Sequence, residues 1–273
     1  MSHAWPQAPQ EHAVYRDLST DFWPWPEVLA DLAARPDFSG ALELQDSDTR
    51  GHALFAEGEL LGSRYEGAVG DLGDLNALAR ALPRARVSLL ALDPAVARLL
   101  WQCRAAEARA EHAPWSETRA ALIARGFCGV VRAQAGDSCW LGGARATGPE
   151  PAAAERVTLL APSASAVSAA EVVAFFNLAL SLAGGGPDLA PFWRASALDL
   201  ADDHPCLDPF AREVVLEGGQ LALLAKVPPT ELLPALQGAL RLTLARSGRA
   251  LAGAGFEALR AHPLWSLSAL EDA

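Results

Sequence analysis

Apolar and polar positions follow a strand-like pattern from Phe38 to Tyr65, which reads FSGALELQDSDTRGHALFAEGELLGSRY. Short apolar runs are separated by residues that favour turns, because Asp and Ser bond their own backbone and Gly takes positive φ without strain. The runs are Ala41–Leu44, Ala53–Phe55 and Leu60–Leu61, and the turns are Asp46–Asp48 and Glu57-Gly58. The pattern predicts a three-stranded antiparallel meander behind a short helix.

A second, degenerate copy of this pattern begins near residue 127. The letters FCG at 127–129 match FSG at 38–40, and RVTLLAPSA from Arg156 matches RVSLLALDP from Arg86. Each copy follows an apolar helical segment, and the second copy lacks a counterpart of residues 72–83. Two matches in the same order favour an internal duplication over a chance likeness between leucine-rich strands.

Apolar residues at helical spacing predict helices around both sets of strands. These helices run from Pro26 to Pro36, from Leu72 to Leu82, from Pro94 toward His112 and from Ala120 to Arg125. Ser168 and Glu171 have capping-box spacing in front of VVAFFNLALSL. That segment is apolar on nearly every side, so we expect it to be central and buried between the two copies.

Beyond the second copy, the glycine-rich stretch 184–187 predicts a linker, and the residues after it follow a different sequence pattern. A hairpin turning at 217–219, an amphipathic helix from Thr230 to Arg246 and a last helix from Phe256 to Ala261 follow. The predicted fold class is therefore α+β, with a duplicated module of a helix plus an antiparallel β-meander and a small C-terminal α+β domain. The predicted parts are a flexible N-terminal arm (1–20), the first module (21–112), its degenerate copy (113–186) and the C-terminal domain (187–273).

Composition and charge narrow the classes of function. The chain of 273 residues has a net charge of −11, and none of its predicted parts carries an excess of basic residues. Both observations disfavour binding to a nucleic-acid backbone. The longest apolar run, Val172 to Ala183, is too short to span a membrane, and the N-terminus lacks the features of a signal peptide.

Four cysteines without regular spacing indicate reduced thiols. Lys226 is the only lysine, and the excess of Arg and Ala suggests a GC-rich bacterial genome. We expect a cytoplasmic protein.

No motif predicts a catalytic residue or a cofactor. Gly136-Asp137-Ser138 resembles the setting of a serine nucleophile, but it lacks a GxSxG pattern and aligns with the turn Asp46–Asp48 of the first copy, so a turn is predicted. One cluster of possible metal ligands follows further on. It consists of Asp203, His204, Cys206 and Asp208. Its spacing fits neither a structural zinc site nor a calcium loop, so no metal is predicted.

Residues 23–102 resemble the PATAN region of bacterial signalling proteins. After a short helix, the segment FSGAL at 38–42 opens a strand, G-x-x-LF at 51–55 forms the next, and EGELL at 57–61 forms the third. The resemblance implies a non-catalytic interaction role and supplies no catalytic residues, and residues 115–183 form a possible degenerate second copy of the same region. This chain differs from the family in having no receiver domain and in carrying residues 188–273.

The sequence thus predicts a non-enzymatic bacterial regulatory or scaffolding protein that binds a protein partner or itself. The predicted interaction surface is the turn formed by Glu57, Gly58 and Glu59, because interaction modules use sheet edges and turns for strand addition. The alternative is an enzyme or a small-ligand-binding protein that uses a cleft between the two halves, since ligand sites favour domain interfaces. A deep pocket with convergent polar groups would favour this alternative. Nucleic-acid contact through an arginine patch is a weaker option, which the net charge opposes.

Overall fold

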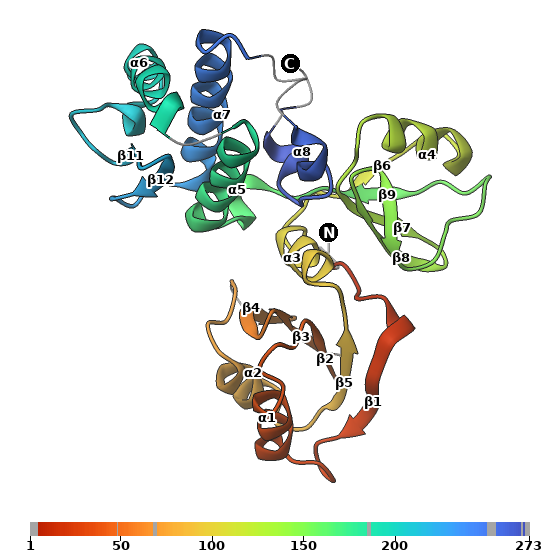
Figure 1. Ribbon diagram of the computed structural model, residues 1–273. Coiled ribbons are helices and arrows are strands. Elements are labelled where there is room, and N and C mark those ends of the chain that lie inside the picture. Colours follow the sequence, from red (N-terminus) through yellow and green to blue (C-terminus); the bar gives the residue numbers. More distant parts are fainter. Residues whose placement is uncertain are drawn as a thin grey trace. The chain divides into compact units, whose positions relative to one another are not determined.

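The structure is a computed structural model that describes residues 5–47, 49–67, 70–184, 187–249, 255–268 and 270. Contacts divide these residues into two compact units (Figure 1). The first unit holds the residues up to 120 together with 129–140 and 145–161, and the second holds 121–128, 141–144 and the residues from 162 onward. The predicted α+β class is confirmed, because both units combine helices with antiparallel strands.

A five-stranded antiparallel sheet forms the first half of the first unit, with strand order β1-β5-β2-β3-β4. The strands are β1 (Ala13–Ser19), β2 (Gly40–Asp46), β3 (Thr49–Ala56), β4 (Glu59–Tyr65) and β5 (Arg86–Ala91). The associated helices are α1 (Trp25–Ala33), α2 (Leu75–Ala81) and α3 (Pro94–Gln102). Asp74 and Asp93 cap α2 and α3 through side-chain oxygens that accept backbone N–H groups, as expected for acidic N-caps.

The two faces of this sheet differ in character because side chains alternate along each strand. On one face, apolar side chains from β2, β3 and β5 pack against α1 and α2 and form the hydrophobic core of this half. On the opposite face, α3 packs near the apolar residues Ala41, Leu54 and Leu90. Further along the same strands this second face becomes polar, and the candidate site lies there.

The second sheet repeats the strand order of the first, which confirms the predicted duplication. Its strands are β6 (Arg109–Ala110), β7 (Gly129–Ala133), β8 (Gly136–Leu141), β9 (Ala144–Thr147) and β10 (Thr158–Leu160). They lie in the order β6-β10-β7-β8-β9, so each strand has a counterpart in the first sheet. Helix α4 (Trp115–Ala124) precedes β7 as α1 precedes β2, and α2 has no counterpart, as the sequence predicted.

The register of the central hairpins fixes which residues of the two copies correspond. Gly40 pairs with Phe55 and Gly129 pairs with Trp140, so three positions further along Glu43–His52 corresponds to Arg132–Asp137. The alignment of Asp137 with the turn at Asp46 was therefore wrong. Residues 136–139 lie in strand β8, and Ser138 is fully buried with its hydroxyl bonded to Trp140 and to the Val131 carbonyl.

The second unit is mainly helical and contains a two-stranded hairpin. Its elements are α5 (Ala169–Leu182), α6 (Ala190–Leu200), β11 (Val214–Glu217), β12 (Gln220–Leu223), α7 (Pro229–Arg246) and α8 (Trp265–Ser268). The predicted capping box is confirmed, since the Ser168 hydroxyl accepts from the backbone of Glu171 and the Glu171 carboxylate accepts from the backbone of Ser168. The Asn177 side chain bonds both backbone groups of Leu221 and so ties α5 to the hairpin.

Several local predictions were wrong for identifiable reasons. Residues 13–19, assigned to a flexible arm, form edge strand β1, which needs few apolar residues because one side has no neighbouring strand. The helix predicted to run toward His112 ends at Gln102, beyond which the segment has no continuous apolar stripe to pack. No helix was predicted over α6, although Pro191 in its first turn is compatible with a helix.

Helix α5 was predicted to be buried between the two copies, but part of its surface is exposed. The exposed fractions of Leu178 and Leu182 are 46% and 37%, and the helix packs within the second unit on α7 and β12. The last predicted helix is a 3₁₀ turn, Phe256–Leu259. Asp48 of the first predicted turn and residues 185–186 of the predicted linker lie outside the described residues. No helix in the described ranges is long and apolar enough to cross a membrane.

Candidate functional site

The polar part of the first sheet carries two parallel rows of side chains. Because cross-strand partners share a face, β5, β2 and β3 place Ser88, Glu43 and His52 in one row and Arg86, Gln45 and Arg50 in the next. Between the two rows, Leu44 of β2 and Val87 of β5 point into the core on the other face. The rows therefore arise from alternation of side chains along strands that register brings side by side.

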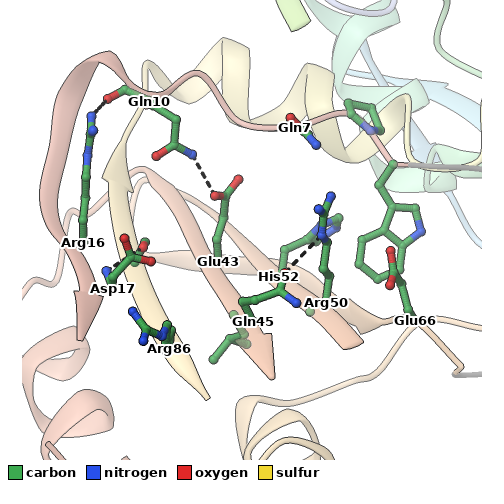
Figure 2. A pocket seen from close by; sticks show the side chains of 15 residues that line it. Gln7, Gln10, Arg16, Asp17, Glu43, Gln45, Arg50, His52, Glu66 and Arg86 are labelled. Carbon is green, nitrogen blue, oxygen red and sulfur yellow. Dashed lines mark hydrogen bonds between the residues drawn. The ribbon is translucent and has the colours of Figure 1, made fainter. Parts of the chain in front are cut away.

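A pocket of about 360 Å³ lies over these two rows (Figure 2). The N-terminal segment, residues 5–10, forms its roof, and side chains from β1 and from the end of β4 complete its walls. The charged and polar lining groups outside the two rows are Gln7, Gln10, Arg16, Asp17 and Glu66. All of these residues belong to the first unit, so the pocket is contained within one module.

Glu43 stands at the centre of the pocket and holds the roof. Its two carboxylate oxygens accept hydrogen bonds from the backbone N–H of Ala8 (3.2 Å) and from the side chain of Gln10 (2.8 Å), as Figure 2 shows for the latter. Burial raises the pKa of Glu43 above its usual value, and its hydrogen bonds to Gln10 and Ala8, together with the positive charge of Arg50, oppose this shift only in part. No ion pair of Glu43 is found within the described part of the chain.

His52 lies next to Glu43 in the same row and packs edge-on against Trp5 of the roof, with ring centroids 4.3 Å apart. Burial, aided by the positive charge of Arg64, lowers the pKa of His52 to about 4. The ring is therefore neutral at pH 7. Its Nε2 atom is enclosed and has no hydrogen-bond partner among the described residues.

The second row is cationic, and neither of its two arginines forms an ion pair within the described residues. The Arg50 Nε donates to the Gln45 Oε1 at 3.1 Å, and Gln45 in turn donates to the Ser47 carbonyl at 2.7 Å. This chain of contacts orients Arg50 and leaves its terminal nitrogens exposed. The Arg86 guanidinium has no hydrogen bond or ion pair in the described ranges.

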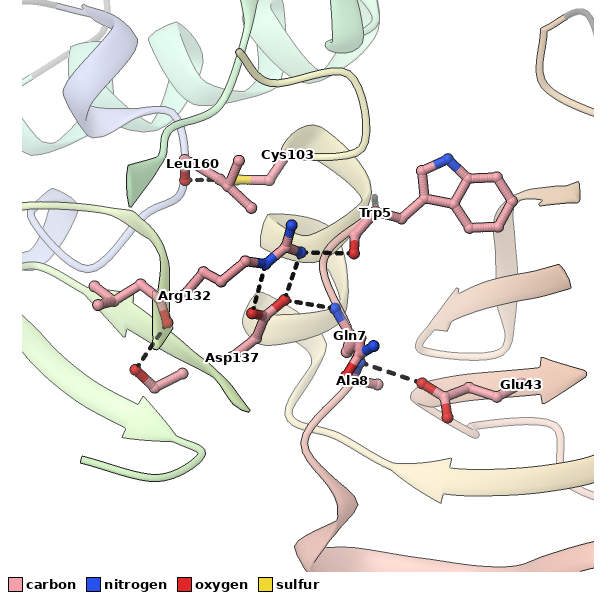
Figure 3. A network of polar contacts seen from close by, with 10 residues as sticks. Trp5, Gln7, Ala8, Glu43, Cys103, Arg132, Asp137 and Leu160 are labelled. Atoms are coloured by element: carbon pink, nitrogen blue, oxygen red, sulfur yellow. Dashed lines mark hydrogen bonds and ion pairs between the residues drawn. The ribbon is translucent and has the colours of Figure 1, made fainter. Parts of the chain in front are cut away.

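The roof segment is also bonded to the second sheet (Figure 3). Arg132 and Asp137 form a two-point ion pair with distances of 2.9 and 2.8 Å. Arg132 donates to the carbonyl of Trp5 at 2.8 Å, and Asp137 accepts from the backbone N–H of Gln7 at 2.8 Å. Glu43 and the Arg132–Asp137 pair thus hold consecutive parts of one segment.

No local sequence pattern marks these residues as a site. Alternation of polar and apolar residues was visible in β2, β3 and β5, but the pattern alone did not reveal which polar positions share a row. The roof was missed because residues 5–10 were assigned to a flexible arm. The predicted cleft between the two halves differs from this pocket, which lies on one sheet.

The predicted interaction turn lies between β3 and β4 and is held against its own module. Glu57 forms an ion pair with Arg98 of α3 at 2.9 Å, and its backbone N–H donates to the Ser39 hydroxyl at 2.7 Å. Gly58 has a φ of 81°, and a Cβ there would lie 1.6 Å from the Pro36 carbonyl oxygen, so this position requires glycine. Glu59 is exposed at the start of edge strand β4.

The weak metal-ligand cluster spans the turn Pro205–Leu207 in the second unit. Asp203 is exposed, Cys206 is buried, and His204 and Asp208 are half-buried. The Asp208 carboxylate accepts from the backbone N–H of Phe210 at 2.9 Å, and burial raises the pKa of the Cys206 thiol to about 11. The part of the chain that the structure describes contains no group of three or more His, Cys, Asp or Glu side chains placed to hold a metal ion.

The pocket chemistry favours recognition over acid–base catalysis. Paired groups with opposite pKa shifts are a common sign of an active site. Here, however, the Nε2 atom of His52 is enclosed, and each oxygen of Glu43 already accepts one hydrogen bond from the roof, so the pair is not arranged to pass a proton to a reacting group. The exposed terminal nitrogens of the arginine row are available to hold an anionic group.

The chain was compared with models of protein families, with curated proteins and with solved structures. The resemblance to the PATAN region remains a prediction from the pattern of residues 23–102. No family model, no curated protein and no solved structure matches the chain.

Proposed function

We propose that this chain is a cytoplasmic, non-catalytic bacterial regulatory protein whose first module binds a small polar ligand in the pocket under residues 5–10. The pocket itself carries the proposal, because it combines a volume of about 360 Å³ with convergent polar groups from three strands and a roof. Ligand sites are typically pre-formed concave pockets with a few placed polar groups.

A regulatory role agrees with the way the roof is held. The segment that covers the pocket contacts Glu43 on the first sheet and Asp137 on the second. A ligand that binds Glu43 would compete with the contact between Glu43 and this segment. It would thereby weaken the attachment of the segment to both sheets, because the two contacts are made by neighbouring backbone groups. The resemblance to PATAN regions, which implies an interaction role, supports the same proposal.

A thermal-shift screen with a library of polar metabolites tests the ligand-binding function. Substitution of Gln45→Trp places a large ring on the pocket floor, whereas Arg84→Trp adds the same ring at an exposed site outside the pocket lining. We expect at least one compound to raise the Tm of the native chain and of Arg84→Trp but not of Gln45→Trp. A screen without any such compound, or equal shifts in both variants, would contradict the proposal.

A protein partner, or a second copy of this chain, is the second candidate, and it is favoured by the exposed start of β4. Leu72 pairs with Ser63, and among the described residues no strand lies beside the edge near Glu59. Sheet edges of this kind accept an added strand. The Glu57–Gly58–Glu59 surface remains the proposed contact.

Charge reversal at this edge tests the partner proposal. We expect Glu59→Arg to weaken capture of a partner from native lysate, or self-association in sedimentation experiments, about tenfold. The Tm should change little, because exposed charges contribute little to stability. Glu57→Arg is a poorer probe, since it also breaks the ion pair with Arg98. Glu117→Arg, at an exposed position of α4, is the control, and equal association by all variants would exclude this surface.

A further inference from the structure

We propose that the pocket ligand is a small zwitterion with a carboxylate and an ammonium group close together, as in a free α-amino acid. This inference rests on the proposed ligand-binding function and specifies its ligand class. The carboxylate would lie over the Arg86–Gln45–Arg50 row, and the ammonium over Glu43. Each end is assigned from charged groups that form no ion pair within the described residues.

The anionic end is assigned from the two arginines that flank Gln45. Neighbouring strands lie about 4.8 Å apart, so Arg50 on β3 and Arg86 on β5 stand roughly 10 Å apart at the backbone with Gln45 between them. The Nε of Arg50 is used by Gln45, and the terminal nitrogens are exposed. A carboxylate above Gln45 can therefore accept from both guanidinium groups, which match carboxylate geometry well.

The cationic end is assigned from Glu43. Its carboxylate is half-buried, and each oxygen has one donor, Ala8 or Gln10, so each can accept one more hydrogen bond. Buried charges in proteins are normally paired, yet no ion pair of Glu43 is found in the described residues, and the charge of Arg50 acts on Glu43 only from beyond ion-pair distance. Glu43 lies one two-residue step, about 7 Å, from the arginine row, which suits a ligand whose two charges are close together.

The remaining charges of the pocket favour a ligand with both signs over an anion or a cation. Arg16, Arg50 and Arg86 line the pocket together with Asp17, Glu43 and Glu66, so the formal charges cancel while His52 is neutral. A dianion would meet the exposed carboxylates of Asp17 and Glu66, and a dication would meet the arginines. The volume of about 360 Å³ lies near the lower end for ligand pockets and suits a small molecule.

Calorimetric titration with single free amino acids tests the ligand class. For each amino acid that binds, the N-acetyl derivative, which lacks the ammonium, and the carboxamide, which lacks the carboxylate, are titrated as matched probes. We expect at least one amino acid to bind saturably and each derivative to bind at least tenfold more weakly, since hydrogen bonds to charged groups are the strong ones.

Variants assign each ligand charge to its protein group. Glu43→Gln should weaken the free amino acid at least tenfold and leave the N-acetyl derivative unchanged, because that derivative already lacks the partner of Glu43. Arg50→Gln and Arg86→Gln should each weaken the free amino acid at least tenfold and leave the carboxamide unchanged, because the carboxamide already lacks the carboxylate that the arginines bind. Arg84→Gln, outside the pocket, should bind as the native chain does. A Tm close to that of the native chain shows that each variant is folded.

The outcomes separate this inference from the function on which it rests. If no amino acid binds but another metabolite does, and Gln45→Trp blocks it, the ligand class is wrong and the ligand-binding function stands. If Glu43→Gln weakens the amino acid and its N-acetyl derivative equally, the assignment of the ammonium to Glu43 is wrong. If nothing in either panel binds, both proposals fail.

Discussion

Glu43 and His52 face each other across β2 and β3, and burial shifts their pKa values in opposite directions, each away from its charged form. For Glu43 the folded pKa lies above the unfolded value, so the stability it contributes is fully present at acid pH and is lost as the pH rises through the folded pKa. For His52 the folded pKa lies below the unfolded value of 6.5, so its contribution is lost as the pH falls.

The contribution of His52 to the stability of the folded chain should therefore decrease as the pH falls from 6.5 to about 4, where only the unfolded chain protonates His52. One such proton changes the free energy of unfolding by up to ~1.4 kcal/mol per pH unit. Replacement of His52→Gln should flatten this slope in urea unfolding measured from pH 7 to 4.5. His12→Gln, at an exposed histidine, should leave the slope unchanged. An identical slope in His52→Gln and the native chain would show that His52 is not buried as described.

At the level of elements, the N-terminal segment depends on an ion pair that lies far from it in sequence. The side chain of Asp137 is 4% exposed and accepts from Arg132 and from the backbone of Gln7. Removing one partner of a buried pair leaves an uncompensated charge, which is strongly destabilising. The roof of the pocket is thus held by the second copy as well as by the first.

Substitution of Asp137→Asn should release this segment. We expect the protection of the amides of residues 5–12 against hydrogen exchange to fall markedly, and the free energy of unfolding to fall by about 2–4 kcal/mol. Arg109→Gln removes the exposed pair with Glu111 and should lower the free energy of unfolding by less than about 1 kcal/mol. Unchanged exchange in residues 5–12 of Asp137→Asn would mean that the pair does not hold the roof.

The elements that sequence could predict are those with a local signal. Alternation in 40–65 and the caps at Asp93 and Ser168 fixed strands and helix starts, because each depends on neighbours in sequence. Strand β1 and helix α6 had no such signal, since their burial depends on distant partners. Prediction of the pocket would also have required the register of the strands. Glu43 and His52 share a row only through strand register, and the pairing of Arg132 with Asp137 across a hairpin is likewise set by register.

At the level of the whole molecule, the division into two units does not follow a single point in the chain. Residues 121–128 and 141–144 belong with the C-terminal residues, although they adjoin the second sheet in sequence. Within that unit the Cys128 thiol lies 3.3 and 3.5 Å from the carbonyl oxygens of Arg260 and His262. A Cβ on Gly142 would come within 2.9 Å of the same Arg260 carbonyl.

A fragment that ends at residue 161 should therefore be much less stable than the full chain. It would lose the Arg260 and His262 carbonyls that the thiol of Cys128 contacts, and so would expose this residue, which is buried in the full chain. We expect it to unfold without cooperativity or to aggregate, as judged by calorimetry and light scattering beside the full chain. Cooperative unfolding at the Tm of the full chain would show that the first unit needs no part of the second.

The bonds of the N-terminal segment also have a consequence for the order in which the chain is completed on the ribosome. Gln7 and its partner Asp137 are 130 residues apart. At a synthesis rate of about 5–20 residues per second, roughly 6–26 s pass between them. The strands that form the pocket floor are complete by Ala91, well before Arg132 and Asp137 are made. The floor thus precedes its full cover during translation, and the roof cannot become fixed until Arg132 and Asp137 have been made.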